Sequence, residues 1–322
     1  MFIKLFIKIL TIFFMIAFGG LARKLNIIDK ESMKKMSRIV TNFFYPALIF
    51  SSLITNFSLK ELMNNYLLPI GAIIIMLVGY FIGIFFTKLI EFNDEKEKNS
   101  FHFQCTINNY SFLPLPIIFM LWSDKGVAKL IFSSLGSEIS VWTIGILALT
   151  GNKFSKKTLY HLISVPMIAI FLSIFVIIIK SLIPENNIFF EKEIISEIWN
   201  SFLFGIDIFG KGTIPIAMFI VGGRMVELNL KKIFSLKHLY LVIIRLIIIP
   251  GICGIIFSLL PFENSIRNIL LVVGVMPCAI ASVVLGEVYD ADIEFNTTSV
   301  LTTHLFSLIT IPIWLYIFIF NK

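Results

Sequence analysis

The segment from Phe101 to Met120 limits the possible folds more than any other part of the chain. Its two ends are apolar, whereas its middle reads Thr106-Ile-Asn-Asn-Tyr-Ser-Phe-Leu-Pro-Leu-Pro116. The prolines at 114 and 116 remove backbone donors and clash with the preceding turn, so a regular helix cannot pass through here. In hydrocarbon, a helix break survives only where its free N–H and C=O groups face protein or a wet cavity. The segment therefore predicts either an interrupted membrane helix that binds a ligand at its break or a structural helix with a proline kink.

The composition indicates an integral membrane protein. Of the 322 residues, 57% are hydrophobic and 15% are charged, whereas soluble domains carry about 25% charged residues. The net charge of +7 comes from basic residues that lie between apolar runs. Membrane topology explains it better than a nucleic-acid partner does. The cysteines, Cys105, Cys253 and Cys278, lie in apolar segments without metal-ligand spacing, so we expect no disulfide framework, metal site or cofactor.

Ten apolar segments, each near the ~20 residues that a bilayer requires, predict an all-α integral membrane protein. The first is interpreted as a membrane helix, because no small-residue cleavage site ahead of a soluble domain marks it as a cleaved signal. Short polar connections separate the segments, as at 91–100. We expect one transmembrane transporter domain over 1–322, with spans at 2–21, 39–56, 66–87, 101–121, 130–149, 159–180, 199–223, 238–260, 268–287 and 298–320.

The distribution of Lys and Arg predicts the orientation. The loops after the first, third, fifth and seventh spans hold sixteen of the 27 Lys and Arg residues, and the opposite side holds nine. Cytoplasmic loops carry the excess of positive charge, and an even number of spans places both ends of the chain on one side. Both termini are therefore expected outside the cytoplasm, in a multi-pass protein of the plasma membrane.

A weak internal repeat divides the chain into a first five-helix repeat over 1–150 and a second over 151–322. Pro46 in the second span pairs with Pro215 in the seventh, and Pro116 in the fourth pairs with Pro277 in the ninth. Because each half has an odd number of spans, the second half must cross the membrane in the opposite sense. Matched interruptions in two inverted halves are typical of a transporter binding site.

Six blocks carry a resemblance to a known family. They are Asn42 to Ala47, Asn109 to Pro116, Pro215 to Gly223, Arg245 to Pro250, Met276 to Tyr289 and Ser307 to Pro312. In this order, and with this number of spans, the chain resembles the auxin efflux carrier family, including the bacterial branch often described as malate or malonate permeases.

The resemblance implies ten helices in two inverted repeats, with helices four and nine broken and crossing at the midplane. It also implies a scaffold and a transport domain, with substrate bound beside the crossover. The chain departs from the family at Ser111 and Pro114, where glycine is common, and at Ala281, where asparagine is common. The pocket is therefore narrower or differently polar, so the identity of the substrate cannot be carried over.

Two broken helices would provide an anion site. The N-termini of the following half-helices carry partial positive charge, so a carboxylate can bind there without a full ion pair. No Arg or Lys lies in either break, and this favours weak, releasable binding. The predicted substrate-binding residues are Asn42, Pro46, Asn108, Asn109, Ser111, Pro114, Pro116, Thr213, Pro215, Pro277 and Ser282.

Ionisable residues inside spans are candidates for ion coupling. Glu138 is interpreted as a proton or cation carrier, or as a neutral hydrogen-bonded carboxyl group. Asp207 and Lys211, at i and i+4, either neutralise each other as an ion pair or contact substrate. His304 either titrates near neutral pH or packs as a hydrogen-bonded side chain. Arg245 is expected to pair structurally or to extend toward the cytoplasm, with contact to substrate as a further alternative.

The sequence contains no Walker loop, GxSxG, HExxH or CxxC motif, so we expect no enzyme. We expect a secondary active or facilitative transporter in the lipid bilayer. Its predicted cargo is a small organic anion, such as malate, malonate or an auxin-like acid, moved by alternating access with proton or sodium coupling left open. One alternative is a sodium-coupled carrier or cation exchanger like the bile-acid symporters. Another is a non-transporting membrane sensor or assembly subunit. A homodimer is also left open.

Overall fold

The computed structural model describes residues 2–151, 163–182, 193–226 and 235–320. Within these ranges the chain forms helices and turns without strands, apart from one isolated bridging pair. Seven helices in this part of the chain are long and apolar enough to cross a membrane, which confirms the predicted all-α membrane protein. They cover Lys30–Asn56, Leu59–Phe86, Pro114–Thr150, Val165–Leu182, Ser196–Met225, Leu236–Leu259 and Ile293–Phe320.

The first half of the chain forms α1 (Phe2–Lys24), α2 (Lys30–Ile39), α3 (Tyr45–Asn56), α4 (Leu59–Asn64), α5 (Leu67–Phe86), α6 (Glu95–Thr106), α7 (Pro114–Ser140) and α8 (Ile146–Thr150), with π-helical turns η1 (Val40–Phe44) and η2 (Val141–Gly145). The second half forms α10 (Val165–Leu182), α11 (Glu193–Lys211), α12 (Thr213–Met225), α13 (Leu236–Ile243), α14 (Ile249–Leu259), α15 (Asn264–Gly274), α16 (Ala281–Val288) and α17 (Ile293–Leu315), with η5 (Ile244–Ile248) and η6 (Tyr316–Phe320). Helix α7 turns sharply at Ser123, whose φ is +52°.

Several helices begin before the predicted spans, and α2 and α6 are the examples that bear on the site. The side chain of Asp29 accepts a hydrogen bond from the backbone of Ser32 and starts α2, nine residues before the predicted second span. Asp94 likewise accepts from Glu97 and starts α6 within the predicted 91–100 connection. An Asp at the N-cap satisfies an otherwise unpaired N–H, and this local effect outweighs the polarity of the segment.

Some predictions concern residues outside the described ranges. Lys153, Lys156, Lys157, Lys231 and Lys232, which contribute to the predicted orientation, lie there, as do residues 159–162 of the predicted sixth span. The ten-span arrangement and the repeats at 1–150 and 151–322 stay predictions.

Both predicted helix breaks are present. Helix α6 ends at Thr106 and α7 begins at Pro114, while α15 ends at Gly274 and α16 begins at Ala281. Pro114 lies in the first turn of α7, where a missing N–H removes no helical hydrogen bond, so this proline starts the helix that follows the break. The prediction that no regular helix passes through the 106–116 region is confirmed.

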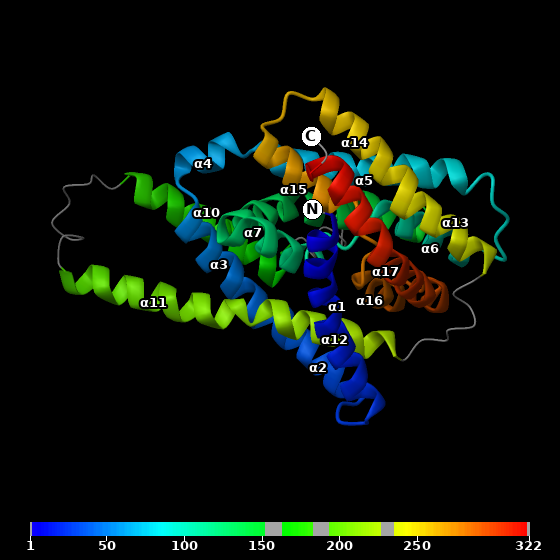
Figure 1. Cartoon of the computed structure of the whole chain (residues 1–322), viewed down its shortest axis with the longest axis horizontal. Coiled ribbons are helices and arrows are strands. Elements are labelled where there is room, and N and C mark those ends of the chain that lie inside the picture. The colour runs from blue at the N-terminus through cyan, green and yellow to red at the C-terminus, as the bar shows by residue number, and fades with distance from the viewer. Residues whose placement is uncertain (1, 152–162, 183–192, 227–234, 321–322) are drawn as a thin grey trace.

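The described helices pack as two groups (Figure 1). The first helix group contains α1, α2, α3, α10, α11 and α12. The second helix group contains α5 to α8 and α13 to α17. Figure 1 shows α3, α10 and α11 on the left and α5, α6, α13 and α14 on the right. Contacts between the groups run mainly from α3 to α7, with further contacts from α1 to α17 and α7 and from α10 to α7. Both helix breaks belong to the second group.

A buried apolar cluster runs through both groups, from Ile49 in α3 through Ile131 in α7 to Leu270 in α15. The outer surface also carries large apolar side chains, such as Phe81 and Phe175, which are 64% and 59% exposed. A water-soluble protein rarely exposes so much contiguous apolar surface, whereas contact with lipid requires it.

Helices α1 and α12 approach each other closely at two glycines. A Cβ atom on Gly19 would lie 1.8 Å from the carbonyl oxygen of Phe219, and one on Gly222 would lie 1.7 Å from that of Ile16. Glycine is therefore required at both positions for this backbone contact, as in many membrane helix pairs. The contact fixes α1 against α12 within the first helix group.

We predict that Gly222→Ala separates α1 from α12 and lowers the stability of the detergent-solubilised protein by about 1–3 kcal/mol, because the added methyl group overlaps backbone atoms. Gly205→Ala in α11 is the matched control, since no atom lies within 4 Å of the position that its added methyl group would take. There we expect a gain of about 0.5–1 kcal/mol from the helical preference of alanine. Thermal unfolding measures both, and equal melting temperatures for the two variants would contradict the packing argument.

Candidate functional site

The two helix breaks lie side by side and pair through their backbones. The N–H of Asn109 donates to the carbonyl oxygen of Pro277 at 2.8 Å, and the N–H of Ala279 donates to that of Ile107 at 3.4 Å. Asn108 and Cys278 form an antiparallel bridge between these bonds. Each unwound segment has backbone N–H and C=O groups without a helical partner. Some of these groups bond to the other break instead, as their burial requires.

Side chains hold the two breaks in register. The Asn108 amide donates to the carbonyl oxygen of Val273, which lacks its usual helical donor because residue 277 is proline. The N–H of Cys278 donates to Thr303 Oγ1 in α17 at 3.2 Å. Arg245 is fully buried and donates to three backbone carbonyls around the breaks, so its structural alternative is correct and extension toward the cytoplasm is not seen.

His304 fixes the side chain of Asn109. Its Nδ1 lies 2.7 Å from the carbonyl oxygen of Val300, and its Nε2 lies 3.2 Å from Asn109 Nδ2. Because the carbonyl can only accept, Nδ1 carries the proton and Nε2 accepts from the Asn109 amide. Asn109 Oδ1 in turn accepts from the N–H of Leu113 at 3.4 Å. Both ring nitrogens of His304 thus have a partner, and the ring orients the side chain of Asn109.

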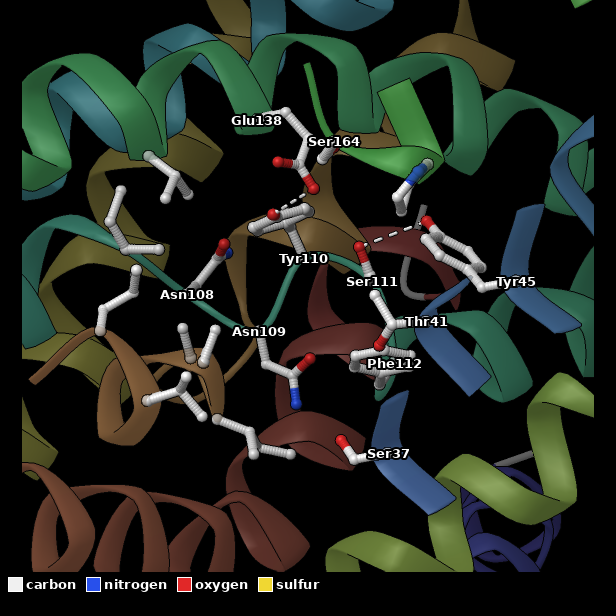
Figure 2. Close-up of a pocket in the computed structure, with 18 of the residues that line it drawn as sticks. Ser37, Thr41, Tyr45, Asn108, Asn109, Tyr110, Ser111, Phe112, Glu138 and Ser164 are labelled. Atoms are coloured by element: carbon white, nitrogen blue, oxygen red, sulfur yellow. Dashed lines mark hydrogen bonds between the residues drawn. The ribbon is translucent and has the colours of Figure 1, made fainter. Parts of the chain in front are cut away.

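A first cavity of about 480 Å³ lies between the two helix groups, beside the breaks. Figure 2 shows side chains from α2, η1 and α3 on one side and from the break at 107–113 on the other. The Tyr110 hydroxyl donates to Glu138 Oε1 at 2.8 Å, and the Tyr45 hydroxyl donates to Ser111 Oγ at 3.3 Å. The volume suits a small-molecule ligand, and amide, hydroxyl and carboxyl groups converge on it.

Three basic side chains line the same cavity. Lys34 and Arg38 are exposed and lie one turn apart on α2, and Arg224 is in the last turn of α12. All three belong to the first helix group, whereas Glu138 belongs to the second. At a rise of 1.5 Å per residue, Lys34 and Arg38 lie within about 10 Å of Thr41 along the helix axis. They therefore place positive charge near the polar side chains inside the cavity.

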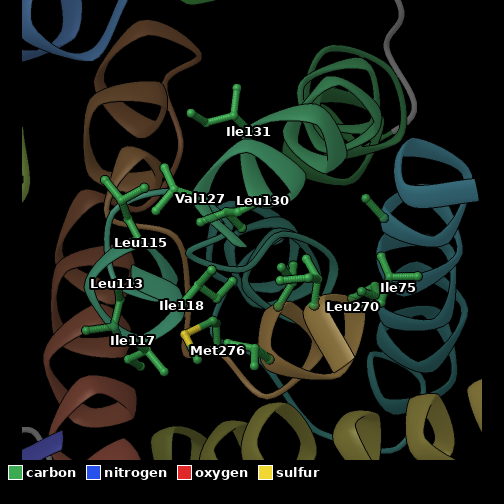
Figure 3. Packing of buried hydrophobic residues seen from close by; sticks show 14 of the residues in the cluster. Ile75, Leu113, Leu115, Ile117, Ile118, Val127, Leu130, Ile131, Leu270 and Met276 are labelled. Carbon is green, nitrogen blue, oxygen red and sulfur yellow. The ribbon is translucent and has the colours of Figure 1, made fainter. Parts of the chain in front are cut away.

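Hydrophobic packing closes the breaks on the side away from this cavity. Figure 3 shows Leu113, Ile117 and Ile118 at the start of α7 packed near Met276. Leu113 and Met276 are buried at 1% and 0% exposure. The breaks therefore present polar groups toward the cavity and toward α17, while their remaining surface is embedded in the apolar core.

A second cavity, of about 330 Å³, lies at the same contact between the helix groups, lined by residues of α1, α3, α7, α11 and α12. A charged cluster borders it. Lys211 Nζ lies 2.6 Å from Asp207 Oδ2 and 3.7 Å from Asp124 Oδ2, and Ser51 Oγ lies 3.5 Å from Asp207 Oδ1. The predicted i, i+4 ion pair is confirmed, and Asp124 connects it to α7 in the second helix group.

Comparison with known proteins identifies the family. The membrane transport protein family matches residues 4–315. The chain belongs to this family. It is the auxin efflux carrier family that the sequence motifs indicated. Two archaeal relatives, each named an uncharacterized transporter, align over 310 residues. The protein from Methanocaldococcus jannaschii is 24% identical and that from Methanothermobacter thermautotrophicus 21%, each alignment covering 95% of this chain and 96% of the relative.

The structure divides the predicted site residues between the two cavities and positions that line neither of them. Asn42, Asn108, Asn109, Ser111 and Glu138 line the first cavity, and Pro116, Lys211 and Pro215 line the second. Pro46, Pro114, Thr213, Pro277 and Ser282 line neither of these two cavities.

Ser282 is fully buried behind the break and accepts a hydrogen bond from the Gln104 amide at 2.8 Å. The same amide donates to Asn296 Oδ1 at 3.0 Å. The sequence analysis did not predict a role for Gln104 or Asn296. An amide side chain inside an apolar span could have indicated one. Sequence reasoning also did not assign a site role to Tyr45 or Tyr110, which stand inside two of the family blocks.

Exposure of the two cavities can be measured with thiol reagents. Cys105, Cys253 and Cys278 are buried, so we predict that the folded wild-type protein resists N-ethylmaleimide. Thr41→Cys in the first cavity and Thr11→Cys in the second should react in detergent solution.

The matched control is Thr213→Cys, because Thr213 is fully buried and lines neither cavity. It should stay unmodified until the protein is denatured. Mass spectrometry of the intact protein counts the added groups. Rapid labelling of the wild type, or protection of both cavity variants, would contradict the cavity geometry.

Proposed function

We propose that this membrane transport protein is a secondary carrier of small organic anions that works by alternating access. The observation that carries the proposal is the position of the first cavity. The cavity is lined by Asn108, Asn109 and Ser111 of the paired helix breaks. The basic side chains of Lys34 and Arg38 line it as well. A cavity with basic groups at its approach and neutral hydrogen-bonding groups inside attracts an anion and still releases it.

The proposed architecture has ten membrane crossings in two inverted repeats. The seven candidate spans supply seven crossings and the apolar helix α1 supplies another. The other two are interrupted: α6 continues past its break into the first turns of α7, and α15 continues into α16. The first helix group would then act as scaffold and the second as the transport domain that carries the broken helices.

Helix α16 supports anion binding at the inner end of the first cavity. Ala279, Ile280 and Ala281, around its first turn, line the cavity. The N-terminus of a helix carries partial positive charge, which favours a carboxylate. The cavity walls also include Phe103, Phe112 and Trp142, so the carboxylate's organic body meets apolar surface. Mono- and dicarboxylates such as malate, malonate or auxin-like acids fit this description.

Two cavities at one interface support alternating access. Tyr45 lines the first cavity, and Leu48, one turn later in α3, lines the second. Between the cavities, Tyr45 bonds to Ser111 and its ring lies 5.8 Å from that of Phe112. By the distribution of basic residues, the first cavity opens toward the cytoplasm. A rigid shift of one helix group against the other would exchange the open and closed sides.

A substrate screen is the first experiment. A ligand that binds only the folded protein raises its melting temperature, with a stabilisation of about 2.7 kcal/mol at a concentration of 100 Kd. Purified protein should be screened against mono- and dicarboxylates, and the best ligand used for uptake into proteoliposomes. A membrane sensor or assembly subunit would show no uptake, which would contradict the carrier proposal.

We predict that Asn109→Ala lowers uptake at least about tenfold, because it removes a hydrogen-bond donor at the break and leaves His304 without its partner, at a cost of about 1–3 kcal/mol. Asn93→Ala, at an exposed position that lines neither cavity, is the control. Initial uptake rates are normalised to the amount of folded protein. Unchanged uptake with Asn109→Ala would remove the break from the site.

Glu138 provides a means of proton coupling in the same cavity. In its charged form this carboxylate repels a bound anion, whereas in its protonated form it does not, so the proton and the anion bind cooperatively. Tyr110 faces Glu138 directly.

We therefore predict that wild-type affinity for the anion increases as the pH falls. Glu138→Gln should abolish this pH dependence, because glutamine keeps the size of the side chain and resembles the protonated acid. Titrations at several pH values measure the affinity, and uptake driven by a fixed pH gradient measures the coupling. A pH dependence that is the same in wild type and Glu138→Gln would exclude this residue as the coupling group.

A further inference from the structure

Arg245 joins the ends of two different half-helices. It lies in the π-helical turn η5 and has 0% exposure. Its Nε donates to the carbonyl oxygen of Met276 at 3.1 Å, one terminal nitrogen donates to that of Cys105 at 3.0 Å, and the other donates to that of Gly274 at 3.3 Å. Each nitrogen of the guanidinium group thus binds a different backbone carbonyl, which suits its planar fork of donors.

These carbonyls are available because the helices break. In a continuous α6, the carbonyl of Cys105 would accept from the N–H of Asn109, which instead donates to Pro277. In a continuous α15, the carbonyl of Gly274 would accept from the N–H of Cys278, which instead donates to Thr303. Both C-termini carry partial negative charge, so two negative helix ends meet at one buried point.

The charge of Arg245 has no carboxylate counterpart among the described residues within ion-pairing distance. Burying a lone charge is costly, so its surroundings must replace the lost hydration. Here backbone carbonyls and two helix dipoles do so. Carbonyl oxygens at the C-terminal ends of broken helices are also the groups that coordinate alkali cations in transporters with unwound helices.

We propose that Arg245 is a built-in cation that occupies the carbonyl cluster at the paired breaks, so that the protein needs no Na⁺ there to fold or to bind its anion. Only the transport part of this inference rests on the proposed carrier function. The guanidinium group neutralises the same oxygens that a bound metal cation would neutralise, and it moves with the protein through every conformation. The ion coupling that a bound Na⁺ would provide is therefore absent at this point.

The backbone around Arg245 is itself fixed. Pro250 has no N–H, so the carbonyl of Leu246 lacks its usual donor four residues on. The indole Nε1 of Trp314 donates to this carbonyl at 2.7 Å in its place. The bond ties η5 to α17, which also holds the His304 and Thr303 side chains against the breaks. Arg245 is thus a positioning residue in a frame that spans α13, α14 and α17.

Thermal unfolding of the purified full chain tests the proposal in NaCl and in N-methyl-D-glucamine chloride at equal ionic strength. We expect the wild-type melting temperature to be the same in both salts. Arg245→Gln removes the charge, leaves a shorter polar side chain, and should melt several degrees lower. The melting temperature of this variant should be about 2 °C or more higher in NaCl than in N-methyl-D-glucamine chloride, because Na⁺ can then enter the carbonyl cluster. Methylguanidinium at millimolar concentration should stabilise Arg245→Gln more than the wild type.

Two further variants separate charge from packing. Arg245→Lys retains the charge and should show no response to Na⁺, although it loses donors. Arg267→Ala is the control, because Arg267 also donates to backbone carbonyls, those of Leu260 and Phe262, but lies away from the breaks. It should show neither a Na⁺ response nor rescue by methylguanidinium.

The outcomes are distinct. A wild-type protein that is stabilised by Na⁺, or whose anion uptake stops in Na⁺-free buffer, overturns the proposal and leaves the carrier function standing. Equal salt responses of wild type and Arg245→Gln also overturn it. If Arg245→Gln does not fold, the wild-type comparison and Arg245→Lys decide. Absence of any uptake, together with a Na⁺ response confined to Arg245→Gln, supports the proposal and rejects the carrier function.

Discussion

The need to satisfy backbone hydrogen-bonding groups in a low-dielectric interior determines this structure. Unwinding two helices inside an apolar protein frees N–H and C=O groups that have no water to bind. The chain meets this need by placing the two breaks side by side, so that the N–H groups of Asn109 and Ala279 donate across to the other break. The carbonyls left over are bound by Arg245, by the amide of Asn108 and by backbone amides. Removing either break would leave the other unsatisfied, so the two interruptions depend on each other.

This mutual dependence explains where polar residues gather. The amides and hydroxyls of Gln104, Ser282, Asn296 and Thr303 lie behind the breaks, where they bind one another and the unwound backbone. The amides and hydroxyls of Asn108, Asn109, Ser111 and Tyr110 lie on the cavity side. A ligand in the cavity therefore meets a surface that is already held in place by a second layer of hydrogen bonds. Such support costs little reorganisation on binding and keeps the groups at fixed positions.

The sequence predicted the breaks because Pro114, Pro116 and Pro277 act locally, through missing donors and steric clashes that need no knowledge of the fold. Helix starts at Asp29 and Asp94 were missed because their polar neighbourhood was given more weight than the N-cap. Asn108, Asn109 and Ser111 were found as cavity residues since polar side chains in an apolar span stand out. Ser282 stands out equally, yet it faces Gln104, because which side of a short helix meets the cavity depends on packing against α6 and α17. The long-range partners of Arg245, more than 100 residues away in one case, could not be derived from any local pattern.

The proposed preference for anions follows from the charges around the paired breaks. Two broken helices bring two C-termini and two N-termini into one region, and without further charges their dipoles would attract ions of both signs. Arg245 neutralises the C-terminal ends of α6 and α15 with a covalently attached charge. The N-terminal end of α16 stays open to the first cavity, and Lys34 and Arg38 add positive charge at its approach. The remaining field around the cavity is therefore positive, apart from Glu138. In the proposed carrier, a carboxylate that enters would gain from this field, and it would gain most when Glu138, the opposing charge among the described residues that line the cavity, carries a proton.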